Sequence, residues 1–152
     1  MELKEEILIA APREAVYAAL NDVEILKECI PGCEELIKHS DTELEAKVTL
    51  KVGPVKAKFK GNVTLNPDNP PEHFSLTGEG SGGAAGFARG GAEVTLTEVE
   101  GGTLLIYTAS ADIGGKLAQL GSRLIQGTAK KLASKFFETF AAKVVETESA
   151  KN

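Results

Sequence analysis

The sequence predicts an α+β fold in which a curved antiparallel sheet of seven strands wraps around one long C-terminal helix. Two observations lead to this prediction. Between about residues 33 and 112, apolar and polar side chains alternate with a period of two, as in strands with one buried face. From Lys116 to about residue 146, apolar residues recur every three or four positions, which is typical of an amphipathic helix.

The N-terminal part supplies one strand and two short helices. Residues 2–9 alternate and predict the first strand. Pro12 lies where a helix begins, because proline is tolerated in a first turn, and Asn21-Asp22 can cap a second helix. That helix should end at Ile30-Pro31-Gly32, since proline cannot continue it and glycine turns the chain.

Six further strands follow, separated by turns rich in glycine or proline. The strand that begins at Cys33 precedes five others, at 43–51, 55–65, 73–79, 87–98 and 103–112. At 1.5 Å per residue, the helix after them is roughly 45 Å long and can cross the whole sheet. The order β-α-α-β6-α, ending in one long helix, is that of a helix-grip fold.

Length and composition narrow the class of protein. We expect a single domain over the 152 residues, with a core at about 2–146 and a polar tail at 147–152. A net charge of −5 and the absence of tryptophan argue against nucleic-acid binding. Without a secretory signal or a membrane-spanning run, we expect a cytoplasmic protein, with any membrane contact peripheral and at the inner face.

The turns of the predicted sheet divide into two chemically different sets. Successive turns of an antiparallel meander alternate between the two ends of the sheet. The turns near 39–43, 66–71 and 98–102 are polar and contain acidic residues, whereas those near 30–32, 52–55, 80–87 and 113–115 contain no charge. An uncharged rim is suited to the mouth of a hydrophobic pocket. The predicted rim residues are Pro31, Gly32, Val52, Pro54, Gly82, Gly83, Gly114 and Gly115.

Small residues on the predicted inner face indicate a cavity beneath this rim. Ala46, Ala57 and Gly61, for example, leave room between the sheet and the helix. A dry, fully packed core is the alternative interpretation of the same residues. The predicted cavity residues are Phe59, Phe87, Tyr107, Ala109, Leu117, Leu120, Gly121 and Leu124.

Two motifs have ordinary structural interpretations. Gly78–Gly83 contains the pattern G-x-G-x-x-G, but a strand follows where a dinucleotide site needs a helix, so we interpret it as a hairpin loop. Cys29 and Cys33 lack the two further ligands that zinc needs, which favours structural thiols in a reducing compartment. We therefore expect no metal and no covalently bound cofactor.

Catalysis has little support in the sequence. No serine, cysteine or histidine lies in a recognisable nucleophilic or acid–base arrangement, so we expect a non-catalytic protein. A buried pair formed by Arg89 and Glu93, or by Tyr107 and Asp112, would reopen the possibility of an enzyme.

One predicted hairpin has a basic outer face. Lys51, Lys56 and Lys58 lie beside the uncharged rim and are candidates to contact a membrane or a partner. A lysine near an anionic membrane surface contributes about 1 kcal/mol. The competing interpretation is a solvated strand face that discourages edge-to-edge aggregation.

Four motifs give the sequence a family resemblance. It resembles the carbon monoxide dehydrogenase G-subunit family, a branch of the START-like (SRPBCC, Bet v 1-like) superfamily, in Cys29-Ile30-Pro31-Gly32-Cys33, Val52-Gly53-Pro54-Val55-Lys56, Gly86-Phe87 and Gly114-Gly115-Lys116-Leu117-Ala118-Gln119-Leu120-Gly121. The resemblance covers about residues 2–146. Many relatives continue into a C-terminal segment that can contact the membrane, and this chain departs from that pattern, so transient contact through the rim is the expectation.

The resemblance implies an accessory role. We expect a module that binds a quinone or another lipid-like molecule and serves a molybdenum hydroxylase of the carbon monoxide dehydrogenase type, by membrane recruitment or quinone delivery. One alternative is a docking or assembly factor for the same enzymes with no bound ligand. Another is an enzyme of the cyclase or hydrolase type, which would need a titratable pair inside the cavity.

Overall fold

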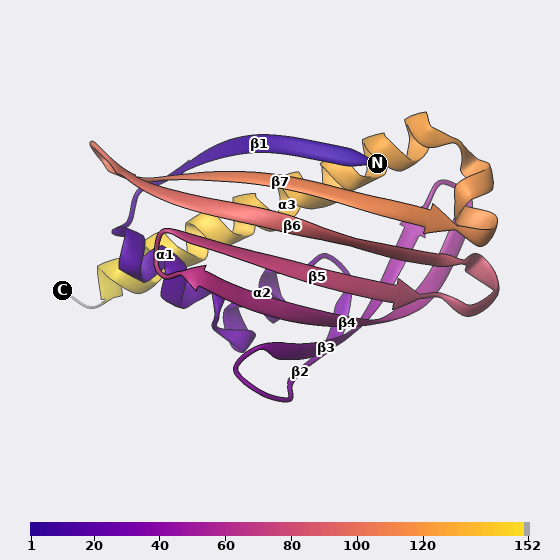
Figure 1. Ribbon diagram of the computed structural model, residues 1–152, viewed down its shortest axis with the longest axis horizontal. Helices are drawn as coiled ribbons and strands as arrows, with labels where there is room; N and C mark the ends of the chain where they lie inside the picture. The colour runs from indigo at the N-terminus through magenta and orange to yellow at the C-terminus, as the bar shows by residue number, and fades with distance from the viewer. Residues whose placement is uncertain (151–152) are drawn as a thin grey trace.

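The computed structural model describes residues 1–150 and confirms the predicted fold class (Figure 1). The elements are β1 (Glu2–Ile9), α1 (Arg13–Leu20), α2 (Val23–Cys29), β2 (Cys33–Lys38), β3 (Glu43–Val52), β4 (Val55–Asn69), β5 (His73–Ser81), η1 (Gly83–Ala85), β6 (Phe87–Val99), β7 (Gly102–Gly114), η2 (Gly115–Leu120) and α3 (Ser122–Ala150). The strands form one antiparallel sheet in the order β1-β7-β6-β5-β4-β3-β2. In Figure 1, α3 runs behind this sheet along its length.

Local sequence signals determine where the two short helices begin and end. Pro12 occupies the N-cap position of α1 in an extended conformation, as expected for a residue that introduces a helix. A carboxylate oxygen of Asp22 accepts hydrogen bonds from the backbone N–H groups of Glu24 and Ile25, at 3.0 and 3.4 Å. These bonds satisfy two amides that the first turn of α2 leaves unpaired. The helix ends at Cys29, directly before the Ile30-Pro31 step.

The long helix begins later than the sequence pattern predicts. Residues Gly115–Leu120 form the separate 3₁₀ helix η2, and Gly121 breaks the chain with a φ of +94°. A side chain would disfavour that left-handed conformation, so the α-helix starts only at Ser122. At its other end α3 continues to Ala150, beyond the predicted end of the core at 146, and residues 151–152 of the predicted tail lie outside the described residues.

The core fills only one half of the space between the sheet and the helices. Phe74, Leu96 and Leu105 on the sheet pack with Phe140 and Val144 near the end of α3, and all five are buried. An aromatic cluster, Tyr107, Phe136, Phe137 and Phe140, extends this packing with ring centroids 4.9 to 6.4 Å apart. Toward the opposite end the inner face includes Ala46, Gly61, Gly80 and Ala88, and a chamber lies there.

Candidate ligand-binding site

An apolar chamber of about 300 Å³ lies between β3–β7 and the first turns of α3. Thirteen of the fourteen lining residues are apolar or glycine, and the exception is Thr128. The lining consists of Ala46, Val48, Leu50, Val52, Phe59, Gly61, Gly80, Ala88, Ile113, Leu117, Ile125, Thr128, Ala129 and Leu132. The size is at the lower end of the range for small-molecule pockets, and the lining is almost free of hydrogen-bonding side chains.

Alternation in the strands and small residues together produce the hollow. On β3, the side chains of every second residue from Ala46 to Val52 reach the chamber, as strand geometry requires. Gly61 of β4 and Gly80 of β5 are direct cross-strand neighbours, so no side chain fills the floor between them. Ala88 on β6 is similarly short. At the filled end of the molecule the same face carries Phe74, Leu96 and Leu105, which pack in the core.

The uncharged turns lie around this end of the molecule. A Cβ placed on Gly53, in the β3–β4 turn, would lie 2.7 Å from a methyl carbon of Leu124 on α3. A Cβ on Gly82 would lie 2.5 Å from the ring of Phe59, and one on Gly86 would lie 2.1 Å from the carbonyl oxygen of Gly114. Gly53 and Gly86 also have φ values of +58° and +118°, which favour glycine at both turns.

The α2–β2 loop, with Pro31 and Gly32, joins the same group of turns. The backbone N–H of Thr49, close to the β3–β4 turn, donates to the carbonyl oxygen of Gly32 at 2.9 Å. Of the other predicted rim residues, Val52 reaches the chamber itself. Pro54, Gly83 and Gly115 are exposed, and Gly114 is half-buried.

Seven of the eight predicted cavity residues fall into three groups in the structure. Phe59 and Leu117 line the chamber. Leu120 and Leu124 line an adjoining groove on α3, and the predicted cavity residue Gly121 lies between η2 and α3. Tyr107 and Ala109 belong to the filled core and do not line the chamber.

Phe87 is the clear error among the predicted cavity residues. Its neighbour Ala88 lines the chamber, so Phe87 points to the opposite, outer face, where 44% of its surface is exposed. There the Arg89 guanidinium lies 5.9 Å from the centre of the ring, a cation–π distance. The ring also covers Gly114, because a Cβ there would lie 2.3 Å from two ring carbons.

The predicted cavity residues omit the four chamber residues on α3, namely Ile125, Thr128, Ala129 and Leu132. They recur at helical spacing, so the signal was present. Thr128 and Leu132 belong to the apolar stripe that the helical spacing predicts, whereas Ile125 and Ala129 lie beside that stripe.

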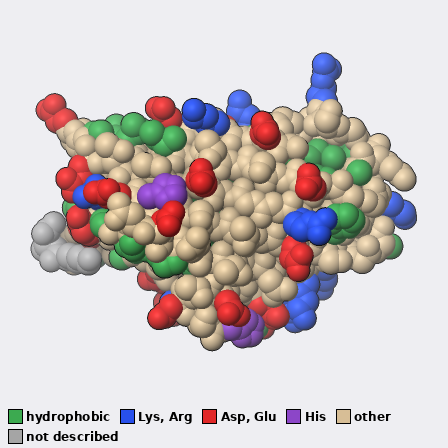
Figure 2. All heavy atoms as spheres, viewed as in Figure 1, with side chains coloured by type: hydrophobic (Ala, Val, Ile, Leu, Met, Phe, Trp, Pro, Cys, Tyr) green, Lys and Arg blue, Asp and Glu red, His purple; other side chains and the backbone are tan. Residues whose placement is uncertain are grey.

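Several cations on the elements around the chamber have no ion-pair partner within residues 1–150. Lys51 and Lys56 are direct cross-strand neighbours beside the β3–β4 turn, a like-charge pair that is unfavourable for the hairpin. Lys58, by contrast, lies 3.8 Å from Glu34. Within residues 1–150, no ion pair is found for Lys51, Lys56, Lys116, Arg123, Lys130, Lys131 or Lys135. Figure 2 shows Lys and Arg side chains projecting from the end of the molecule that carries η2 in Figure 1.

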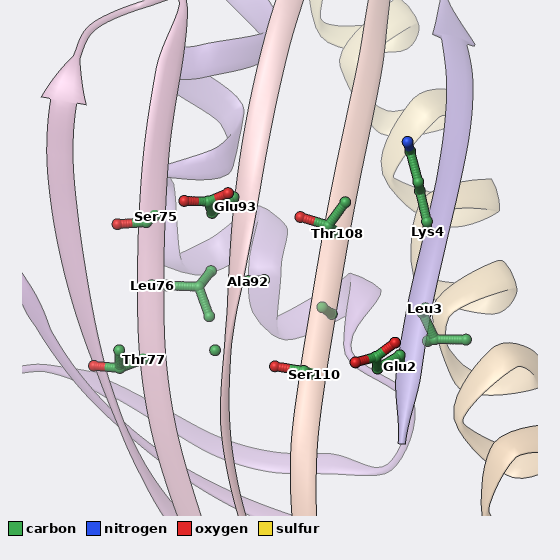
Figure 3. Close-up of a pocket in the computed structure, with 12 residues that line it drawn as sticks. Glu2, Leu3, Lys4, Ser75, Leu76, Thr77, Ala92, Glu93, Thr108 and Ser110 are labelled. Carbon is green, nitrogen blue, oxygen red and sulfur yellow. The ribbon is translucent and has the colours of Figure 1, made fainter.

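The outer face of the sheet carries a separate, open trough of about 740 Å³ (Figure 3). Ser75, Thr77, Thr108 and Ser110 line it with hydroxyl groups from two strands, β5 and β7. Glu2, Lys4 and Glu93 flank them. Among residues 1–150, no group of three histidine, cysteine, aspartate or glutamate side chains could hold a metal ion.

The titratable pairs that would indicate an enzyme do not form inside the protein. Arg89, Glu93 and Asp112 are exposed, whereas Tyr107 is buried against the ring of Phe137. Burial, and secondarily the Glu5 carboxylate, raise the pKa of Tyr107 to about 12.

The two cysteines are free thiols. Burial is the main cause of the raised pKa of both Cys29 and Cys33. The Cys33 thiol lies 3.5 Å from the backbone oxygen of Glu35, to which it donates. These environments are typical of structural cysteines rather than reactive ones.

Comparison with known proteins places the fold and the family. A conserved protein from Geobacillus kaustophilus is similar over 97% of both chains, with 31% sequence identity and a TM-score of 0.90. A START superfamily protein from Mycobacterium smegmatis (11% identity, TM-score 0.71, 96% and 98% coverage) and the Zhui aromatase/cyclase from Streptomyces sp. R1128 (11% identity, TM-score 0.69, 95% and 93% coverage) share the fold.

No curated protein matches the chain significantly. Within residues 1–150, no helix is both long enough and apolar enough to cross a bilayer.

The family comparison agrees with the predicted resemblance, because the model of one family matches residues 6–145 and so covers almost the whole chain. The chain belongs to the carbon monoxide dehydrogenase G-subunit (CoxG) family and has the helix-grip fold of the START superfamily.

Proposed function

We propose that this protein binds a quinone or another lipid-like molecule in the chamber and serves a molybdenum hydroxylase of the carbon monoxide dehydrogenase type. It would do so by delivering the bound molecule or by bringing the enzyme to the membrane. The observation that carries the proposal is the chamber itself, whose lining offers hydrocarbon contact at every position except Thr128. Apolar burial is worth about 25 cal/mol per Å², so such a lining favours a hydrophobic ligand.

The surroundings of the chamber support transfer between a membrane and a partner. The turns near it are uncharged, and Lys51 and Lys56 beside them lack acidic partners in the part of the chain described. Peripheral contact with an anionic membrane would give these lysines countercharges, at about 1 kcal/mol each. The family name supports an association with carbon monoxide dehydrogenase. The proposal does not specify the substrate of the partner enzyme.

Native mass spectrometry of the purified protein, followed by solvent extraction, tests the proposal. We expect a co-purifying isoprenoid or lipid, or a mass shift when a benzoquinone with a decyl tail is added. The variant Ala129→Leu fills part of the chamber and should abolish this shift. Ala142→Leu makes the same change at an exposed position on the same helix and should preserve it.

A clean mass with no shift on addition of the quinone would refute ligand carriage. If that protein still formed a stable complex with a purified molybdenum hydroxylase, it would be a docking or assembly factor. Turnover of an added compound, rather than its release unchanged, would instead favour an enzyme, the class to which the aromatase/cyclase with the same fold belongs.

A further inference from the structure

A second hollow adjoins the chamber on the flank of α3. It is an open groove of about 630 Å³, lined by Leu120, Arg123, Leu124, Gly127, Thr128 and Lys131. Thr128 is the one residue that lines both this groove and the apolar chamber. The two spaces therefore border the same side chain, Thr128, from adjoining sides of α3.

The groove is cationic at one side. Arg123, Gly127 and Lys131 follow one another at a spacing of four residues, so they form one stripe along the helix. Arg123 and Lys131 are exposed, and neither has an ion-pair partner among residues 1–150. An anion seated between them would interact favourably with both charges.

Gly127 leaves the space between these two cations open. A Cβ placed on it would meet no heavy atom within 4 Å, so packing does not explain the glycine. In the interior of an exposed helix, glycine costs about 1 kcal/mol relative to alanine. The position is therefore one where the helix forgoes stability and keeps the groove free of a side chain.

The other stripe of the groove is apolar and leads along the helix toward Thr128. Leu120 and Leu124 lie on it, and 38% of the surface of Leu124 is exposed. The succession from the chamber outward is thus hydrocarbon, one hydroxyl group at Thr128, and then two cations. This succession complements a molecule with an apolar body and a negatively charged end.

We propose that the preferred ligand is a single-chain amphiphile with an anionic head, a carboxylate or a phosphate, whose tail occupies the chamber and whose head lies between Arg123 and Lys131. The inference rests on the proposed function, that the chamber binds a hydrophobic molecule. At about 30 Å³ for each water-sized unit, a chamber of 300 Å³ accepts a tail of roughly ten heavy atoms.

Calorimetric titration with four decyl compounds, below their micelle concentrations, tests this ligand class. Decanoate and decyl phosphate carry an anionic head, decanol is neutral, and decyltrimethylammonium is cationic. We expect both anions to bind about five- to tenfold more tightly than decanol, the cation to bind most weakly, and the preference to shrink in high salt. Inorganic phosphate alone should not bind measurably, because it lacks the tail.

Two double variants assign the head to the groove. Arg123→Gln with Lys131→Gln should remove most of the preference for the anions and leave decanol binding unchanged. Lys130→Gln with Lys135→Gln removes the same charge from the same helix outside the groove, and should retain the preference. Circular dichroism of both double variants checks that the helix is intact.

Equal affinity for decanoate and decanol, or a preference that both double variants retain, would overturn the inference while leaving the chamber as a binding site. Failure of all four decyl compounds and of the decyl benzoquinone would overturn the proposed function as well. The inference would also fail if Arg123→Gln with Lys131→Gln weakened binding to phosphatidylglycerol vesicles and left decanoate binding intact, because the two cations would then contact a bilayer surface.

Discussion

The substitution Ala129→Leu tests whether the chamber is a genuine void. Ala129 lines the chamber, so leucine would place three additional carbon atoms in apolar surroundings. At about 0.8 kcal/mol for each buried methylene, the gain is roughly 2.4 kcal/mol. Ordering the leucine side chain costs about 0.5 to 1 kcal/mol, which leaves a net stabilisation of roughly 1.5 to 2 kcal/mol.

Thermal unfolding followed by circular dichroism measures the effect. For a domain of this length, each 1 kcal/mol shifts Tm by about 2 to 4 °C, so we expect an increase of roughly 3 to 8 °C. Ala133→Leu is the matched control, one helical turn away, because Ala133 packs against the filled core. Overpacking there should lower stability by about 1 to 3 kcal/mol.

The two substitutions should therefore have opposite signs. If Ala129→Leu lowered Tm as much as Ala133→Leu does, no void would exist beneath the first turns of α3 in solution. An unchanged Tm would also count against the void, because the added carbon atoms of leucine would then contribute no stabilisation by burial.

Three further predictions follow from single contacts. Asp22→Ala should cost about 1 kcal/mol in urea unfolding, because it removes both acceptor bonds at the start of α2; an unaffected midpoint would show that the cap is not formed. Tyr107 has a pKa raised above its unfolded value, so its contribution is present below pH 10 and is lost between pH 10 and about 12. Relative to Tyr107→Phe, the protein should lose up to about 1.4 kcal/mol for each pH unit in that window, and parallel curves would contradict this. Iodoacetamide at pH 8 should modify Cys29 more slowly than a free thiol, as followed by mass spectrometry, because burial raises its pKa; an equal rate would mean that the thiol is accessible.

The sequence predicts the positions of the strands well, because each strand has one buried face. Strand boundaries were predicted to within one to four residues, because alternation on a half-buried strand leaves little choice of register. β4 was the largest difference, since it continues to Asn69 through polar residues that carry no alternating signal.

Two details of the site depended on information that alternation does not carry. Phe87 was assigned to the inner face because it is large and apolar. Val94 and Leu96 on the same strand are buried, and because side chains alternate along a strand, Phe87 belongs to the opposite face. The start of α3 depended on the backbone conformation of Gly121, and glycine is compatible both with a helix and with a break. Thr128 and Leu132 of the predicted apolar stripe nevertheless line the chamber, so the late start of α3 changed the helix boundary more than the inward face.

The end of the molecule that carries Lys51, Lys116 and Arg123 differs in charge from the protein as a whole, because no ion pair is found for these three side chains within residues 1–150. The protein carries −5 overall and is repelled as a whole by a negatively charged surface, yet the end with Lys51, Lys116 and Arg123 is attracted to it. Within about one Debye length, roughly 8 Å at physiological salt, the attraction acts on this end before any contact forms. Encounters are thereby selected by orientation, and those in which this end faces the surface are favoured.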